Sequence, residues 1–149
     1  MAQVRKSAAC MRIHGDDLDP EEITRLLGAT PTRAIRKDEK IVGQVTGRVR
    51  VAKSGLWQLK VSDRTPEDLD GQIEEILSQM TDDLAIWRGI SETYPMDLFC
   101  GLFLGVHNEG MSLSAKSLAA LGERGIELDL DIYSGSDEDD KPDAENAVA

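Results

Sequence analysis

The sequence lacks the common catalytic signatures and is poor in residues that hold metals. It contains no Gly-x-Ser-x-Gly, Ser-x-x-Lys, Gly-x-x-x-x-Gly-Lys or His-Glu-x-x-His motif, so the usual nucleophile, phosphate-loop and zinc-protease chemistries have no carrier. His14 is followed by acids at positions 16, 17 and 19, but their spacing is not that of an EF-hand, and a polar turn is the better interpretation. We therefore assign no catalytic residue, no metal ligand and no cofactor, and we favour a protein that is not an enzyme.

Long apolar runs are also missing. The longest uncharged apolar stretch, Leu98–Val106, is about half as long as a membrane-spanning helix. Arg5 and Lys6 near the start have no apolar run behind them, so we expect no secretory signal. Cys10 and Cys100 lie in apolar surroundings, which suits buried thiols in a reducing compartment, although a disulfide between them is possible. The prediction is a cytoplasmic protein that does not enter the membrane.

The chain as a whole has no excess of positive charge and is acidic. The 17 Lys and Arg residues face 28 Asp and Glu residues, a net charge of −11, which argues against general binding to nucleic acid. Residues 1–60 nevertheless carry 12 basic and 7 acidic residues, while residues 61–149 carry 5 and 21. We predict one domain over residues 1–133 and a disordered acidic tail over residues 134–149, which has almost no large apolar residue.

Capping signals and apolar periodicity predict the helices. Asp19 can cap a helix that begins at Pro20, and Gly28 can end it. A second helix has a capping start at Thr65 and an apolar stripe at helical spacing. The predicted helices span residues 20–27, 66–80 and 114–121, with Gly122 as the end of the last, and Leu84 and Trp87 either extend the second helix or form a short one.

Apolar runs and the alternation of apolar and polar residues predict the strands. Residues 8–14, 98–106 and 126–133 form three of them, the second apolar on both faces and the third with one wet face. Odd positions are mostly apolar through residues 41–51 and 56–61, which predicts a hairpin that turns at Lys53-Ser54-Gly55. The basic segment 29–40 is a long connection that is functional or contains an unrecognised short strand.

These elements predict an α+β fold. The expected architecture is a five-stranded antiparallel or mixed sheet with helices packed on one face, in the order β-α-β-β-α-β-α-β.

The first candidate site is the basic hairpin. Arg48, Arg50 and Lys60 are predicted to project from the polar sides of the two strands, and Lys53 lies in the turn, so the four cations share one surface. Nucleic acid is an improbable ligand, because the aromatic residue of this hairpin, Trp57, falls on the core side and gives no stacking platform. The alternatives are ion pairing with Glu127, Asp129 and Asp131 of the last strand, or coverage by the acidic tail.

The second candidate site is the start of the helix 114–121, because its first turn contains no acid. His107, Ser114 and Lys116, with Asn108 and Ser112 nearby, could surround a small anion at the helix N-terminus. The alternative is an ordinary helix cap formed by Ser114.

Several segments together resemble a known family. They are Met11–Pro20, Leu27-Gly28-Ala29-Thr30-Pro31-Thr32, Gly55-Leu56-Trp57 and Ile126–Tyr133. Over about residues 7–133 the chain resembles the bacterial domain-of-unknown-function family 4279. The resemblance implies a small bacterial protein with no established activity, so it transfers no catalytic residue.

We expect a non-enzymatic module that binds an unknown protein partner, in an immunity-like or regulatory role. The alternative is a small-anion or nucleotide-binding protein with weak or unknown enzymatic activity. Sheet edges could also pair two copies into a homodimer.

Overall fold

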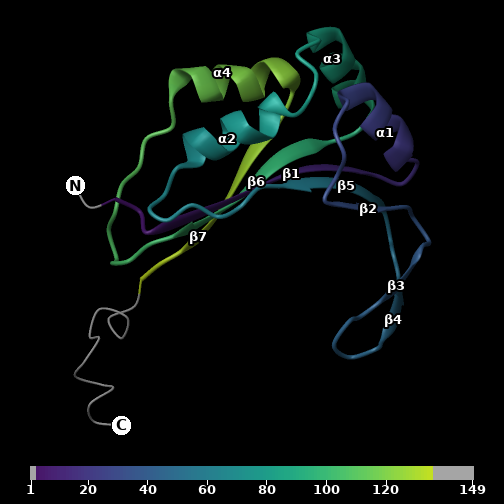
Figure 1. Cartoon of the computed structure of the whole chain (residues 1–149), viewed down its shortest axis with the longest axis horizontal. Helices are drawn as coiled ribbons and strands as arrows, with labels where there is room; N and C mark the ends of the chain where they lie inside the picture. Colours follow the sequence, from purple (N-terminus) through teal and green to yellow (C-terminus); the bar gives the residue numbers. More distant parts are fainter. Residues whose placement is uncertain (1–2, 136–149) are drawn as a thin grey trace.

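A single layer of helices covers one face of a five-stranded sheet in the computed structural model, which describes residues 3–135 (Figure 1). The sheet has the order β2-β5-β1-β6-β7. Its strands are β1 (Lys6–Gly15), β2 (Arg33–Ile35), β5 (Gly55–Lys60), β6 (Met96–Phe103) and β7 (Glu127–Tyr133). The helices are α1 (Pro20–Leu27), α2 (Leu69–Ser78), α3 (Leu84–Thr93) and α4 (Ala115–Arg124). The predicted α+β class and mixed sheet are confirmed. Residues 136–149 of the predicted tail lie outside the described residues.

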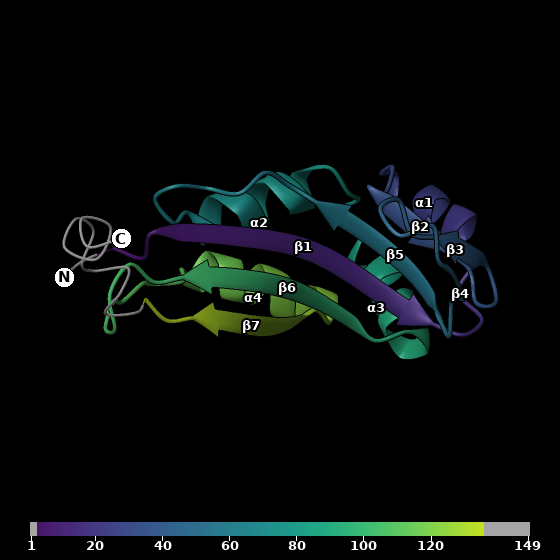
Figure 2. The same ribbon diagram turned by 90° about the horizontal axis from the view of Figure 1, so that it is seen from below.

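The central strand β1 organises the core, because its alternate residues point to opposite faces of the sheet. Ala9, Met11 and Ile13 are buried on the side of the helices. β1 pairs antiparallel with β5 and β6, which places Ile13 beside Trp57 and Met11 beside Leu98. These side chains form the hydrophobic core together with the inner faces of the helices. Within residues 3–135, no helix lies on the other face of the sheet (Figure 2).

β7 is the edge strand beyond β6. It pairs parallel with β6, and α4 provides the connection between the two strands. The register places Leu128, Leu130 and Ile132 beside Leu98, Cys100 and Leu102, on the side of the helices. The predicted acids of this strand therefore lie on the uncovered face, as their alternation indicated.

The helix ends follow mostly from their caps. The Asp19 carboxylate accepts a hydrogen bond from the backbone N–H of Glu21, and Gly28 adopts the left-handed conformation (φ 70°) after α1. Leu84 and Trp87 belong to a separate helix, α3. The predicted end of the last helix at Gly122 is wrong, because the left-handed residue is Gly125 (φ 74°) and α4 continues to Arg124.

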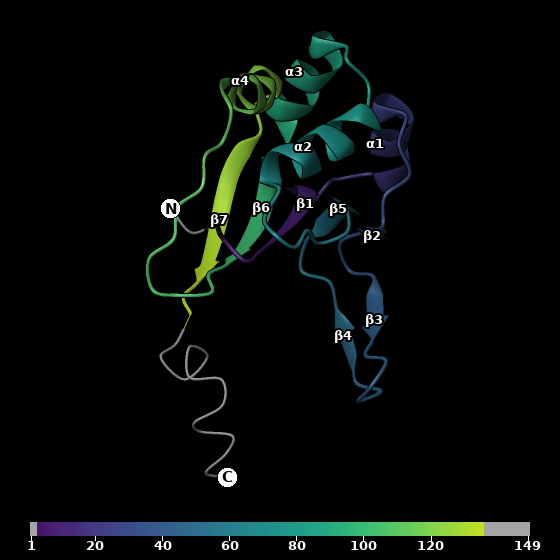
Figure 3. The same ribbon diagram turned by 60° about the vertical axis from the view of Figure 1, so that its left-hand side comes forward.

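The predicted hairpin is paired differently. Residues 41–51 do not form one strand against 56–61: β3 (Lys40–Val42) and β4 (Val49–Val51) pair with each other in a separate two-stranded sheet. Gly47 (φ 67°) donates its N–H to the Gly43 carbonyl at 2.9 Å and closes the turn between them. β5 pairs instead with β1 and with β2, the short strand that segment 29–40 contains. Residues 40–51 thus form a hairpin arm that projects from the body (Figure 3).

A buried polar cluster fixes α2 on β1. The Gln72 side chain is fully buried, and its amide N–H groups donate to the backbone carbonyls of Ser7 and Ser62 at 3.2 and 2.9 Å. The Ser7 hydroxyl donates to Gln72 Oε1 at 2.6 Å. Each polar group is satisfied, so the cluster holds α2 in one position over the sheet.

Candidate functional site

The predicted basic surface is divided between two parts of the molecule. Arg48 and Arg50 are exposed on the hairpin arm, Lys53 follows it, and Lys60 ends β5 in the main sheet. The prediction that these cations share one surface of a two-stranded hairpin is therefore wrong, because β4 and β5 belong to different sheets. Among the described residues, none of the four has an ion-pair partner within 4.0 Å.

The acids of β7 meet a different cation. β1 and β6 separate β7 from β5, so the predicted pairing of these acids with the hairpin is also wrong. Arg12 on β1 makes a two-pronged contact with Asp97 at 2.8 and 2.7 Å and lies 3.6 Å from Asp129. Its hydrogen bond to Asp97 raises the pKa of Arg12, and its guanidinium lies 4.3 Å from the Phe99 ring centre. Sequence reasoning missed this cluster because only the registers of β1 with β6 and of β6 with β7 bring its members together.

Aromatic residues stand on the same uncovered face. Phe103 and Tyr133 stack with ring centres 4.7 Å apart, and the ammonium of Lys6 lies 4.3 Å from the Phe103 ring centre. Tyr133 donates a hydrogen bond from its hydroxyl to Asp131 at 2.6 Å. The face therefore mixes aromatic, basic and acidic groups, and its carboxylates oppose an anionic polymer such as nucleic acid.

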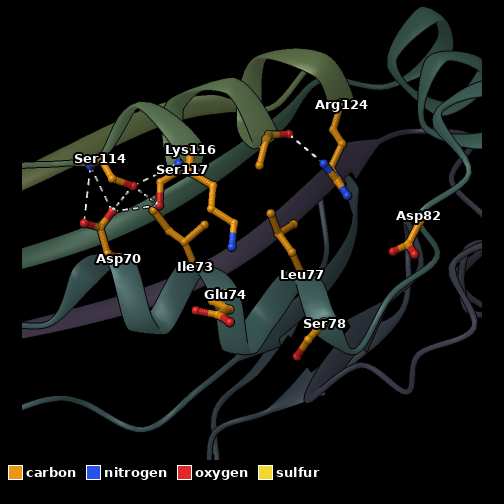
Figure 4. Close-up of a pocket in the computed structure, with 11 residues that line it drawn as sticks. Asp70, Ile73, Glu74, Leu77, Ser78, Asp82, Ser114, Lys116, Ser117 and Arg124 are labelled. Atoms are coloured by element: carbon orange, nitrogen blue, oxygen red, sulfur yellow. Dashed lines mark hydrogen bonds between the residues drawn. The ribbon is translucent and has the colours of Figure 1, made fainter.

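A carboxylate of the protein itself occupies the start of α4 (Figure 4). Asp70 on α2 accepts hydrogen bonds from the Ser114 amide at 3.1 Å, the Ser114 hydroxyl at 3.1 Å and the Ser117 hydroxyl at 2.7 Å. Burial acts to raise the pKa of Asp70, but the hydrogen bonds from Ser117 and Ser114 outweigh it and hold the pKa below its ordinary value. The Asp70 carboxylate thus occupies hydrogen-bond donors at the start of α4 that an external anion would otherwise use.

The other predicted members of the anion site belong to α4 and to the connection before it. Lys116 is exposed in the first turn of α4, and His107 is exposed in the connection between β6 and α4. The structure adds Asp70, which sequence reasoning missed because it lies 44 residues before Ser114 in the chain.

Beside this contact, α2 and α4 enclose a pocket of about 330 Å³ (Figure 4). Ile73, Leu77 and Ala120 are among its lining residues, and Lys116 and Glu74 bring opposite charges to it. Arg124, at the far end of α4, donates from Nη1 to the Ala120 carbonyl at 3.0 Å. The pocket offers apolar contact with charges of both signs at its rim, which suits binding better than proton transfer or nucleophilic attack.

A larger hollow, of about 520 Å³, lies on the helix side of the β7 edge. Leu130 and Ile132 of β7 are 43% and 57% exposed there, and Leu118 of α4 is 51% exposed. We call this hollow the edge groove; apart from Glu109 its lining is apolar and comprises Val4, Leu69, Leu102, Leu104, Met111, Leu113, Leu118, Leu128, Leu130 and Ile132. The Glu109 carboxylate accepts hydrogen bonds from the amides of Gly105 and Val106, which orders the connection that borders the groove.

The two cysteines have the properties of unreactive thiols. Cys10 and Cys100 are free and buried on neighbouring strands, so the disulfide that the sequence left open is not formed. Burial raises the pKa of the Cys10 thiol to about 11 and that of Cys100 to about 12. Thiols of this kind are mostly protonated at neutral pH and react slowly.

Within residues 3–135, no group of three or more His, Cys, Asp or Glu side chains is placed to hold a metal ion. No helix in that range is long and apolar enough to cross a membrane.

Comparison with known proteins identifies a family. Neither a curated protein nor a solved structure matches the chain significantly. A family model matches residues 3–135, which include all the helices and strands described above. The chain belongs to that family, which is described as Domain of unknown function (DUF4279).

Proposed function

We propose that this protein is a non-enzymatic protein-binding module and that the edge groove is its contact surface. The observation that carries the proposal is the exposure of Leu130, Ile132 and Leu118 around one apolar hollow at the edge of the sheet. Apolar side chains that gather in one exposed place mark protein contacts more often than single exposed ones do. The groove gives a partner a shaped apolar surface without any rearrangement of the fold.

The alternative, a small-anion or nucleotide-binding protein, has less support. The amide and hydroxyl donors at the start of α4 already hold the Asp70 carboxylate. An external anion would have to displace this carboxylate and leave a negative charge close to itself, and like charges at short distance repel each other. The uncovered face carries Asp97, Asp129 and Asp131 beside its cations, which also disfavours a phosphate ligand.

Site-specific photocrosslinking in cells tests the proposal. A photoreactive phenylalanine analogue replaces Ile132 in one version of the chain and Val45 in a matched control. Val45, on the hairpin arm, is 98% exposed and therefore more accessible than Ile132. We expect a discrete protein adduct from position 132 and none from position 45.

A competition experiment distinguishes specific binding from random collision. Excess unlabelled chain should suppress the adduct, whereas excess Ile132→Asp chain should not, after thermal unfolding has shown that this variant is folded. Equal adducts from positions 132 and 45, or no adduct from position 132, would contradict a contact role for the edge groove.

A further inference from the structure

We propose that the edge groove binds an extended peptide segment as a sixth strand on β7, and that apolar and basic side chains alternate along this segment. The inference rests on the proposed function, since it names the partner chemistry of the same surface. It is argued from the backbone of β7, from the apolar residues on one side of that strand and from the acids on the other.

The backbone argument concerns the two edges of the sheet. The edge strand β2 is three residues long, whereas β7 is seven residues long. Among the described residues, no strand pairs with β7 on the side away from β6. A strand of seven residues offers enough free N–H and C=O groups for a short ladder, and an exposed edge of this kind is a template for an added strand.

The apolar argument concerns the side chains that face the helices. Leu128, Leu130 and Ile132 recur at every second position of β7 on that side. The groove extends from them to Leu118 on α4 and to Met111 in the connection before it. Every second side chain of a strand added beside β7 would point into this groove. Those side chains must be apolar, because the lining offers them almost no polar partner.

The charge argument concerns the opposite face of β7. Glu127, Asp129 and Asp131 alternate with the apolar residues and lie on the uncovered face. Arg12 approaches Asp129, but within the described part of the chain neither Glu127 nor Asp131 has an ion-pair partner within 4.0 Å. The remaining side chains of an added strand would stand beside this acidic row, where Lys or Arg stabilises the pair and Asp or Glu destabilises it.

The same acidic row argues against a second copy of the chain as the occupant. Antiparallel pairing of two β7 strands would place Glu127, Asp129 and Asp131 of one copy beside the same three residues of the other. Like charges that face each other across strands are unfavourable. The row thus discourages self-association at an otherwise open edge, while it leaves that edge attractive to a basic strand.

Three labelled heptapeptides test this chemistry by fluorescence anisotropy with the full chain. One alternates Lys and Val, one alternates Glu and Val, and the third has the composition of the first but with all three Val residues grouped at one end. We expect the alternating Lys/Val peptide to bind at least about tenfold more tightly than either control peptide.

Two charge-reversal variants distinguish the effect of the β7 acids on peptide affinity from the effect of the overall negative charge. Glu127→Lys with Asp131→Lys leaves Asp129 and its contact with Arg12 intact, and it should lower the affinity for the Lys/Val peptide by about tenfold and raise that for the Glu/Val peptide. Glu74→Lys with Glu92→Lys changes the net charge equally at exposed positions on α2 and α3, and it should leave the preference for the Lys/Val peptide unchanged. Ile132→Asp should weaken binding of the Lys/Val peptide without lowering the unfolding temperature by more than a few degrees.

Several outcomes would overturn the inference. They are equal binding of the Lys/Val and grouped peptides, equal loss in both charge-reversal variants, or retention of full affinity by Ile132→Asp. A concentration-dependent dimer in sedimentation that Ile132→Asp abolishes would assign the edge to a second copy instead. An adduct at position 132 together with no peptide binding would leave the proposed function standing and refute the strand chemistry alone.

Discussion

β5 and the hairpin arm have the same alternating sequence pattern but opposite environments. Trp57 and Leu59 of β5 are 0% and 2% exposed, whereas Val49 and Val51 of β4 are 59% and 51% exposed. Alternation predicts a strand in each segment: β5 is one strand, whereas the arm is divided into the short strands β3 and β4. The difference shows that alternation identifies a strand, while burial of its apolar half depends on what else the chain brings to it.

The two regions differ in the further strands and helix that pack against them. β5 lies between β1 and β2, and α1 covers Trp57, whose indole N–H donates to the Thr24 hydroxyl at 3.0 Å. The arm consists of two short strands that pair only with each other among the described residues. An isolated pair of strands has marginal stability of its own, so the arm depends on its attachment to the body.

The largest expected effect comes from Trp57→Ala. Removal of this fully buried side chain should destabilise the protein by about 3–5 kcal/mol, because it leaves a cavity between α1 and the sheet. Urea unfolding followed by circular dichroism measures the change. Val49→Ala in the arm is the matched control and should change the free energy of unfolding by less than about 0.5 kcal/mol. Similar losses in the two variants would remove the distinction between body and arm.

Local signals predicted much of the body because a cap and its helix are neighbours in the chain. Asp19 and Ser114 cap α1 and α4 as expected, and β1 forms at the predicted strand-like run. The hairpin was misassigned because odd-numbered apolar residues continue across the turn at Gly43 and Gly47, so the pattern conceals a change of strand.

The candidate site could be predicted only in part, for the same reason. Ser114 was found because a capping serine precedes its helix, but Asp70 was not, since its contact joins two distant helices. The alternation of β7 predicted its acidic face. It could not predict the exposure of Leu130 and Ile132, which depends on how far α4 and the preceding connection cover the edge.

A smaller effect tests how the helix layer holds the body together. Asp70→Asn removes the charge that the start of α4 binds, and it should destabilise the protein by about 1 kcal/mol at pH 7. Hydrogen bonds lower the pKa of Asp70 in the folded state, so its contribution is complete above the ordinary carboxyl pKa of about 4 and is lost as the pH falls through the folded-state value. Urea unfolding at pH 7, 5 and 3 should show the two proteins converging in the acid range.

Glu74→Gln provides the control for Asp70→Asn. Glu74 is an exposed carboxylate one turn further along α2, and this substitution should change stability by less than about 0.5 kcal/mol at each pH. A constant difference between the wild type and Asp70→Asn from pH 7 to pH 3 would mean that shape, not charge, is what Asp70 contributes to the contact with α4.

The smallest expected effect concerns the arm itself. Val49→Thr with Val51→Thr keeps β-branched side chains, which favour a strand, and removes apolar groups that are already more than half exposed. Stability should change by less than about 0.5 kcal/mol, because little apolar area leaves a buried environment.

The charge-reversal variant Arg48→Glu with Arg50→Glu should have an equally small effect on stability, since neither cation has an ion-pair partner in the described part of the chain. A loss of more than about 1 kcal/mol in either variant, measured by urea unfolding, would show that the arm packs on the body in solution and belongs to the same cooperative unit as β5.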